Sequence, residues 1–249
     1  MPAPKAVIPS RYGAQRFPGK PLALLLKKTM IQHVYERCVE SKAFSDVIVA
    51  TDDERIASHV KQFGGSVVMT SPDCASGTDR VAEVASKIGG ADDQVFINVQ
   101  GDEPAIHPEA LGTLARAFVN PSIEMGTLIR PLHEAERSNP NVVKVVLDGA
   151  SSGLYFSRAD IPFQRDPGVG TMERWAHVGI YGYRRKTLLR LAALPPTALE
   201  KTESLEQLRA LFHGVRIHCE KTPHSSVAVD RPEDIAPAEA AVQALLASR

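Results

Sequence analysis

The sequence predicts an α/β fold in which a mostly parallel sheet is covered by helices on both faces. Two observations support this prediction. Short apolar, β-branched runs of strand length alternate with helical stretches of about ten residues through the first half of the chain. Such uninterrupted apolar runs are typical of parallel strands that are buried on both faces. After about residue 120 the strands follow one another without long helices between them, which indicates a smaller mixed sheet and a lid.

The elements of the first half alternate regularly. Strands are expected at about 5–8, 46–51, 66–69 and 94–99, and helices, caps included, at about 29–40, 52–64, 78–88 and 108–119. Thr29 and Asp52 are expected to cap the first two helices, because their side-chain oxygens can accept a hydrogen bond from a free N–H of the first turn.

The second half is more irregular. Strands are expected at about 125–130, 142–147, 154–157 and 177–184, and segments 204–213 and 232–248 have helical periodicity. The polar segment 164–171 is the best candidate for a mobile loop. No internal repeat or clean linker interrupts the chain, so one domain over residues 1–249 is expected.

Composition excludes several classes of protein. The 249 residues carry 29 Lys+Arg and 29 Asp+Glu, and 43% are hydrophobic, so the chain can bury a core and is not disordered. Zero formal net charge does not support a nucleic-acid-binding surface over the whole molecule. No apolar run approaches the roughly 18 to 20 residues of a membrane span, and no secretion signal is evident. Three widely separated cysteines exclude a disulfide framework. We expect a cytoplasmic, enzyme-sized protein.

A basic segment follows the first strand. The first 35 residues contain six Lys or Arg and no Asp or Glu, and Arg11, Arg16 and Lys20 lie in the segment 9–21. A loop at the carboxyl end of a parallel strand opens into the ligand crevice of the sheet, so these cations are expected to converge on an anion. A solvated surface loop is the alternative, but three basic residues with two glycines and three prolines in thirteen residues favour a functional loop.

The same segment is not a Walker P-loop. Five residues separate Gly13 from Gly19 where that motif has four, and Pro21 stands at the place of the Mg²⁺-binding Ser or Thr. The two glycines would instead allow the backbone to approach the anion closely.

Two acids follow apolar segments far apart in the chain. Asp102 comes after the strand 95–99, and Asp230 comes after Val227-Ala-Val, which is expected to be a short strand that leads into a helix. Mg²⁺ commonly takes one or two carboxylates, while phosphates and water complete its octahedron. A turn aspartate at Asp102 and a helix cap at Asp230 are the alternatives.

A series of motifs occurs in collinear order from about residue 5 to residue 240. They are IPSRY (8–12), RFPGKPL (16–22), VIVATD (47–52), SGTDR (76–80), NVQGDEP (98–104), YFSR (155–158), HVGIYGY (177–183), LEQLR (205–209) and VDRPED (229–234). Together they resemble the family of CMP-Kdo synthetases, the 3-deoxy-manno-octulosonate cytidylyltransferases.

The resemblance implies an α/β nucleotidyltransferase with a Rossmann-like sheet, usually a homodimer. Such an enzyme transfers a cytidylyl group from CTP to the anomeric hydroxyl of Kdo, an eight-carbon acid sugar, and releases pyrophosphate, for lipopolysaccharide biosynthesis. It also implies a division of the single domain. Residues of about 1–120 and 205–249 would form the nucleotide-binding core, and residues of about 121–204 a sugar-binding and dimerisation elaboration.

The resemblance also assigns roles to residues. Arg11, Lys20 and Asp102 would be catalytic, and Asp102 and Asp230 would bind Mg²⁺. The nucleotide would be held by Arg11, Arg16, Lys20, Ser76, Gly77, Thr78 and Arg80. The acid sugar would be held by Gln100, Arg158, His177, Tyr181, Glu206 and Gln207. Taken alone, Arg158 could equally be an exposed strand-end arginine, and His177 a core histidine. Glu206 and Gln207 could lie on a surface helix face.

Three departures from the family pattern affect the substrate more than the reaction. Ala14 and Gln15 stand where the family usually has hydroxyl residues, KKTM (27–30) replaces a Gly-Lys-Pro-Met turn, and HSSVA (224–228) replaces a glycine-rich approach to the second acid. Two alternatives therefore stay open. One is the same reaction on another acid sugar, such as 8-amino-Kdo or a sialic acid, and the other is a catalytically silent nucleotide-binding paralogue.

Overall fold

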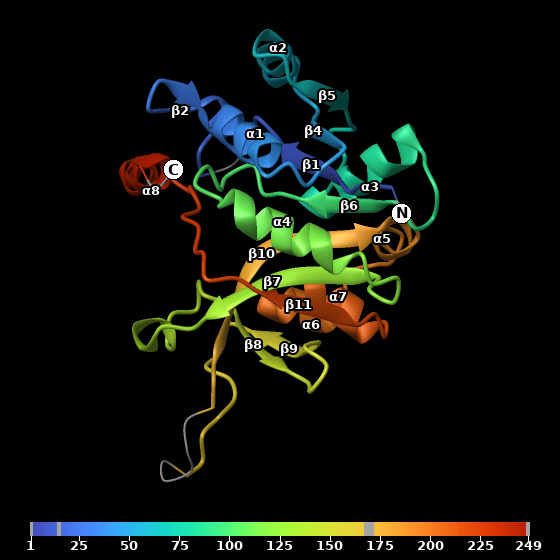
Figure 1. Ribbon diagram of the computed structural model, residues 1–249, viewed down its shortest axis with the longest axis vertical. Helices are drawn as coiled ribbons and strands as arrows, with labels where there is room; N and C mark the ends of the chain where they lie inside the picture. Colours follow the sequence, from blue (N-terminus) through green and yellow to red (C-terminus); the bar gives the residue numbers. More distant parts are fainter. Residues whose placement is uncertain (1, 14–15, 167–171, 248–249) are drawn as a thin grey trace.

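The computed structural model describes residues 2–13, 16–166 and 172–247. Within these residues one nine-stranded sheet has the order β11-β7-β10-β6-β1-β4-β5, with β8 and β9 joined through β10 (Figure 1). Its strands are β1 (Lys5–Ser10), β4 (Asp46–Thr51), β5 (Ser66–Met69), β6 (Val95–Asn98), β7 (Met125–Pro131), β8 (Lys144–Leu147), β9 (Gly153–Ser157), β10 (Trp175–Arg184) and β11 (Ile217–Lys221).

The helices alternate with these strands in the first half. They are α1 (Met30–Glu40), α2 (Glu54–Gln62), α3 (Gly77–Ile88), α4 (Pro108–Ala117), α5 (Arg185–Ala192), α6 (Ala198–Glu203), α7 (Gln207–Phe212) and α8 (Ile235–Ala247). Short 3₁₀ turns lie at η1 (Lys20–Leu22), η2 (Glu134–Glu136) and η3 (Pro232–Asp234), and β2 (Leu24–Leu25) pairs with β3 (Lys28–Thr29). Among the described residues no helix is long and apolar enough to cross a membrane.

Strand direction changes along the sheet as the sequence predicts. β1 pairs in parallel with β4 and β6, and β4 pairs in parallel with β5. Beyond β6 the sheet becomes mixed, because β10 is antiparallel to both β6 and β7 and β11 runs parallel to β7. The prediction of a mostly parallel α/β sheet with a mixed second half is therefore confirmed.

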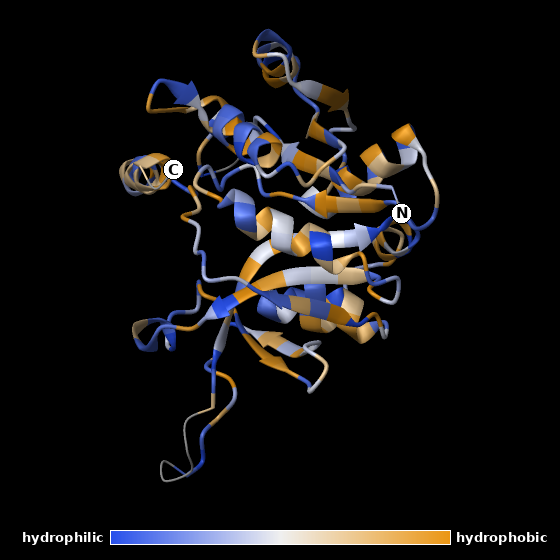
Figure 2. Ribbon diagram, viewed as in Figure 1, coloured by the Kyte–Doolittle hydropathy of each residue, from blue (hydrophilic) through white to orange (hydrophobic). Residues whose placement is uncertain are grey.

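Alternation along the buried strands sorts apolar side chains between two cores. Val7 and Phe96 face one side, where they pack with α3, α5 and α7, whereas Ile8 and Ile97 face α1, α2 and α4 on the other. Figure 2 accordingly shows hydrophobic residues along the strands and on parts of the helices that cover them. Each such side chain contributes about 1.5–3 kcal/mol on full burial, so the two cores fix where the strand ends lie.

Several local expectations were wrong. Asp53, not Asp52, caps α2, since its carboxylate accepts from the backbone N–H of Arg55 at 2.9 Å, whereas Asp52 turns to pair with Arg80. Segment 227–229 forms no strand, and α7 begins only at Gln207, because Ser204 adopts a left-handed conformation with φ of 53°.

Other elements were missed or fall outside the description. The hairpin β2–β3 and the elements α5, α6 and β11 were not expected. Part of the expected mobile loop at 164–171 and the end of the last expected helix lie outside the described residues, as do Ala14 and Gln15.

Candidate active site

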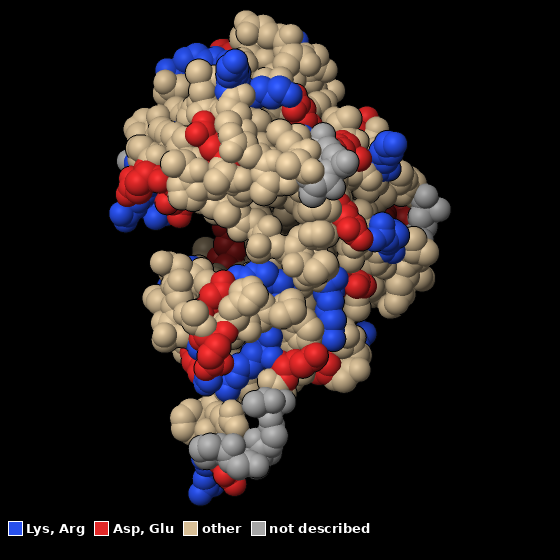
Figure 3. Space-filling model, turned by 60° about the vertical axis from the view of Figure 1, so that its left-hand side comes forward, with Lys and Arg blue, Asp and Glu red and all other residues tan. Residues whose placement is uncertain are grey.

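One cavity of about 400 Å³ opens at the carboxyl ends of β1 and β6. Ten of the residues singled out in the sequence line it: Arg11, Arg16, Lys20, Ser76, Gly77, Arg80, Gln100, Asp102, Glu206 and Asp230. Pro9, Ser10, Pro21, Cys74, Ala75 and Gly101 complete the wall. The space-filling view shows this molecule hollowed between its upper and lower parts, with acidic and basic atoms close together at the hollow (Figure 3).

The two acids meet at one ammonium group. Lys20 Nζ donates to Asp102 Oδ2 at 2.8 Å and to the backbone oxygen of Val229 at 2.7 Å, and it lies 3.7 Å from Asp230 Oδ1. The Arg16 guanidinium lies 3.5 Å from Asp230 Oδ2. Side chains from three distant parts of the sequence therefore form one cluster of two carboxylates and two cations.

The position of Asp102 is fixed by a close contact between the segments that follow β1 and β6. The amide of Val99 donates to the oxygen of Val7 at 3.0 Å, which extends the pairing of β1 and β6 toward the cavity. A Cβ at Gly101 would lie 2.8 Å from the backbone oxygen of Pro9 and 2.9 Å from Ser10 Oγ. Only glycine allows this approach, so the segment after β6 lies against the segment after β1.

A tight turn aims Lys20 into the same cavity. Gly19 has a φ of 74° and donates its amide to the oxygen of Tyr12 at 2.8 Å, directly before η1. Only 15% of the Lys20 side chain is exposed, whereas Arg11 and Arg16 are exposed at the cavity wall. Among the described residues Arg11 makes no ion pair, so its charge is available to an anion.

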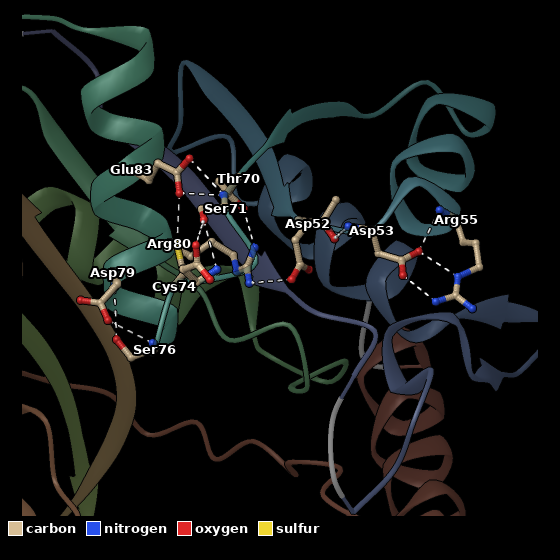
Figure 4. A network of polar contacts seen from close by, with 12 residues as sticks. Asp52, Asp53, Arg55, Thr70, Ser71, Cys74, Ser76, Asp79, Arg80 and Glu83 are labelled. Atoms are coloured by element: carbon tan, nitrogen blue, oxygen red, sulfur yellow. Dashed lines mark hydrogen bonds and ion pairs between the residues drawn. The ribbon is translucent and has the colours of Figure 1, made fainter.

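The amino end of α3 forms another part of the wall. Ser76 caps this helix in a reciprocal pair with Asp79, since Ser76 Oγ accepts from the Asp79 amide at 3.2 Å and Asp79 Oδ2 accepts from the Ser76 amide at 3.0 Å (Figure 4). The free N–H groups and the helix dipole at such an end favour an anion.

Arg80 lies one turn into α3 and is almost fully buried. Its guanidinium donates to Thr70 Oγ1 and lies 3.3 Å from Asp52 Oδ2, as Figure 4 shows. This pairing holds the side chain in place while it lines the cavity. Arg80 is therefore a fixed positive charge at the cavity wall.

Cys74 lines the cavity and Glu103 directly follows Asp102, and the sequence analysis singled out neither. Cys74 Sγ lies 3.1 Å from Glu83 Oε2, and burial together with that carboxylate raises the pKa of the thiol to about 11. Burial and the neighbouring charge of Asp102 raise the pKa of Glu103 to about 7. Glu103 stood inside the NVQGDEP motif, but its burial depends on tertiary packing.

The expected sugar-binding residues separate into two groups. Gln100 and Glu206 line the cavity, and Gln100 Nε2 donates to the oxygen of Gly179 at 3.2 Å. Thr78 Oγ1 donates to Glu206 Oε2 at 2.8 Å, and both line a small neighbouring hollow with Gln207. These residues continue the cavity toward α7.

Arg158, His177 and Tyr181 do not line the cavity walls. Arg158 Nε donates to the oxygen of Glu203 at 2.7 Å, and its Nη1 to the oxygen of Pro140 at 2.8 Å. His177 Nε2 lies 2.9 Å from Thr127 Oγ1, and burial lowers the pKa of His177 to about 3. Tyr181 is buried beside it, with ring centroids 5.3 Å apart. His177 is thus a half-buried, neutral residue in this structure.

A basic loop after β1, an acid after β6 and a helix amino end, all facing one crevice of a parallel sheet, define the class of this protein: an α/β nucleotidyltransferase. The family model described as cytidylyltransferase matches residues 5–217. A 3-deoxy-manno-octulosonate cytidylyltransferase of Myxococcus xanthus is 54% identical over 96% of both chains, and one of Geobacter sulfurreducens is 50% identical over 92% of this chain and 95% of its own.

A solved structure agrees with these relatives. It is described as CMP:2-keto-3-deoxy-manno-octonic acid synthetase complexed with CTP, and it matches with a TM-score of 0.89 at 40% identity over 99% of both chains. The chain belongs to the 3-deoxy-manno-octulosonate cytidylyltransferase family, which confirms the resemblance found in the sequence.

Proposed function

We propose that this chain transfers the cytidylyl group of CTP to the anomeric hydroxyl of Kdo and releases pyrophosphate, for lipopolysaccharide biosynthesis. The observation that carries the proposal is the meeting of Asp102, Asp230 and Lys20 in one cavity. The relatives are named as cytidylyltransferases for this sugar acid, and the similar solved structure is a complex with CTP, so both substrates are taken from them.

The basic residues of the cavity are suited to a triphosphate. Lys20 is a partly buried point charge, and Arg11 and Arg16 are exposed guanidinium groups on the same wall. Attack on the α-phosphorus spreads negative charge over phosphate oxygens, and fixed cations stabilise that charge. We assign Arg11, Arg16 and Lys20 to the phosphates, and Ser76, Gly77, Thr78 and Arg80 to the nucleotide.

The acid sugar is assigned to the side of the cavity near α7. Gln100 and Glu206 offer hydrogen-bonding groups there, and Gln207 lies next to them with a buried Nε2 that has no partner among the described residues. Arg158, His177 and Tyr181 complete the proposed set. In this structure Arg158 and His177 are half-buried and Tyr181 is buried. Arg158 Nε and His177 Nε2 are bonded to other parts of the chain, so contact with the sugar would compete with these bonds.

The donor set of the cavity fits Mg²⁺. Asp102 and Asp230 both point at the same ammonium group, and hard carboxylate oxygens are the ligands that Mg²⁺ prefers. We propose that these two residues hold the ion. When bound, it would neutralise phosphate charge and orient the reacting groups. Lys20 would then be shared between the carboxylates and the phosphate oxygens.

The proposal also covers the oligomeric state and the cellular location of the protein. We propose a homodimer in which residues 121–204 contribute sugar-binding and contact surface, with a nucleotide-binding core from residues 1–120 and 205–249. Leu154, Phe163 and Met172 lie in that part of the chain and are 61%, 86% and 57% exposed, and burial of such side chains against a partner would be favourable. Sedimentation equilibrium would test the dimer. The use of CTP supports a cytoplasmic location.

A pyrophosphate-release assay with CTP, Mg²⁺ and Kdo tests the function. Release above a no-enzyme control is expected, and folded protein that gives none would refute the proposal. Parallel reactions with 8-amino-Kdo and a sialic acid would identify another acid sugar as the better substrate. CTP binding without turnover on any of the three would instead indicate a silent paralogue.

A further inference from the structure

Two histidines outside the cavity stack on each other. The imidazole rings of His107 and His224 have centroids 3.5 Å apart and planes that differ by 2°. His107 immediately precedes α4, whereas His224 belongs to the segment 222–231, which contains neither helix nor strand. The stack therefore joins a helix end to an irregular segment.

Hydrogen bonds fix both rings. His107 Nδ1 accepts from the amide of Glu109 at 3.2 Å and so caps α4. His224 Nε2 lies 3.1 Å from Glu109 Oε2, and because a carboxylate only accepts, this nitrogen carries the proton. Glu109 thus contacts both rings, one through its backbone and one through its side chain.

The segment 222–231 carries Asp230 to the active site. In Figure 1 it runs from β11 to α8 past the end of α4. The amide of Thr222 donates to Ile129 at 2.8 Å at the start of the segment, and the amide of Val229 donates to the oxygen of Asp102 at 2.9 Å near its end. The oxygen of Val229 also accepts from Lys20 at 2.7 Å. The histidine stack lies between these two attachments.

The cluster is not arranged to bind a metal ion. The oxygen of Glu109 and nitrogens of both rings lie within 4.8 Å of one another, as the ligands of one ion would. The lone pairs of two parallel rings point along parallel planes, however, and do not converge on one ion. Nδ1 of His107 is also occupied by the Glu109 amide. The observed geometry is that of a packing contact.

We propose that His107 and His224 form a clasp that positions Asp230 opposite Asp102 for the reaction. The proposal rests on the proposed metal-binding role of these two acids. His107 and His224 are positioning residues, since they act through the backbone of 222–231 and lie outside the cavity lining. Partners that orient metal ligands from outside typically affect metal affinity by about 10–100-fold.

The clasp depends on a neutral His107. Protonation at Nδ1 would remove the acceptor that caps α4. The charged groups that face His107 are His224, Glu109, and Arg37 and Glu40 of α1. Burial, then the charge of His224, lowers the pKa of His107. Because the folded-state pKa lies below the ordinary value, the clasp is intact above about pH 6.5 and weakens as the pH falls toward the folded-state pKa.

Three variants test the clasp. His224→Ala removes the stack, and His224→Phe keeps an aromatic ring without the bond to Glu109. His107→Asn keeps a good helix cap but removes both the stack and the titrating ring. His213→Ala is the matched control, because His213 is an exposed histidine elsewhere on the chain.

The first readout needs no metal and no turnover. Amide hydrogen exchange of residues 222–231 in the metal-free enzyme should become about tenfold faster in His224→Ala and His107→Asn, and His224→Phe should recover most of the protection. The second readout is the Mg²⁺ concentration that gives half-maximal activity. It should rise about tenfold in the same two variants, with kcat changed much less. His213→Ala should match wild type in both.

The pH profile separates a clasp from a merely structural contact. In wild type the half-maximal Mg²⁺ concentration should rise as the pH falls below about 6.5. In His107→Asn it should already be high at about pH 7.5 and should rise less steeply, because only protonation of the nucleotide and of the carboxylates still contributes. Unchanged exchange and unchanged Mg²⁺ dependence in His224→Ala would overturn the clasp if wild type is active and Asp230→Asn is impaired. Full activity of Asp230→Asn would instead refute the proposed metal site.

Discussion

Replacement of Lys20 by methionine tests the central cluster of the site. Lys20→Met keeps most of the length of the side chain but leaves Asp102 and Asp230 without the ammonium that lies 2.8 and 3.7 Å from them. Since 15% of Lys20 and 29% of Asp102 is exposed, water compensates only in part. We expect a loss of about 2 kcal/mol in the free energy of unfolding in EDTA. For a chain of this length that loss lowers Tm by about 4–8 °C.

Mg²⁺ should reverse part of this loss. With the ammonium gone, only the Arg16 guanidinium, 3.5 Å from Asp230, still competes with an ion bound between the two carboxylates. Added Mg²⁺ should therefore raise the Tm of Lys20→Met more than that of wild type. Turnover should remain low, because the triphosphate loses a fixed charge. Thermal scans with EDTA and with Mg²⁺, together with the pyrophosphate assay, measure both effects.

A matched lysine provides the control. Lys28 forms an exposed ion pair with Glu36 at 2.7 Å, and 47% of its side chain is accessible. Lys28→Met should therefore change the free energy of unfolding by less than about 0.5 kcal/mol. The reasoning is refuted if Lys20→Met matches this control in EDTA, or if Mg²⁺ stabilises it no more than wild type.

Three further predictions concern single side chains. Asp102→Asn should retain the fold, as judged by circular dichroism, and lose nearly all turnover. The reason is that removal of one ligand charge costs several kcal/mol of transition-state stabilisation. Near-native activity would mean that the metal site is misplaced. Lys27 lies in the β2–β3 turn with a φ of 71°, and this left-handed backbone conformation costs a residue with a side chain about 1 kcal/mol. Lys27→Gly should therefore raise Tm slightly, and a lower Tm would contradict this. Burial lowers the pKa of His177 to about 3, so stability should decline as the pH falls below about 6.5. His177→Gln should make the urea midpoint less dependent on pH between 7 and 4.5, and an unchanged slope would contradict the assignment.

Local patterns were sufficient for the parallel half of the fold. The runs 5–8, 46–51 and 66–69, which lie in β1, β4 and β5, are rich in apolar and β-branched residues. Gly101 illustrates the limit of such patterns. The sequence places it next to Asp102, but only the packed structure reveals that a Cβ there would meet the backbone of Pro9.

Adjacent acids show why caps were harder to predict. Asp52 and Asp53 are equivalent in propensity, and either could cap α2. Asp53 caps α2, because the Asp52 carboxylate forms an ion pair with Arg80 of α3 instead. The difference arises from a partner on another helix, which no local pattern contains.

The sequence by itself determined the class of the sheet, the basic loop after the first strand and the family, since each depends on residue types at short spacing. Only the tertiary structure decided that Asp230 reaches Lys20 and that His224 stacks on His107. The segment 222–231, which carries both His224 and Asp230, has no hydrophobic periodicity. Its course follows from hydrogen bonds and contacts to Ile129, Asp102 and α4. Contacts between distant parts of a chain depend on how the elements pack, and local propensity does not encode them.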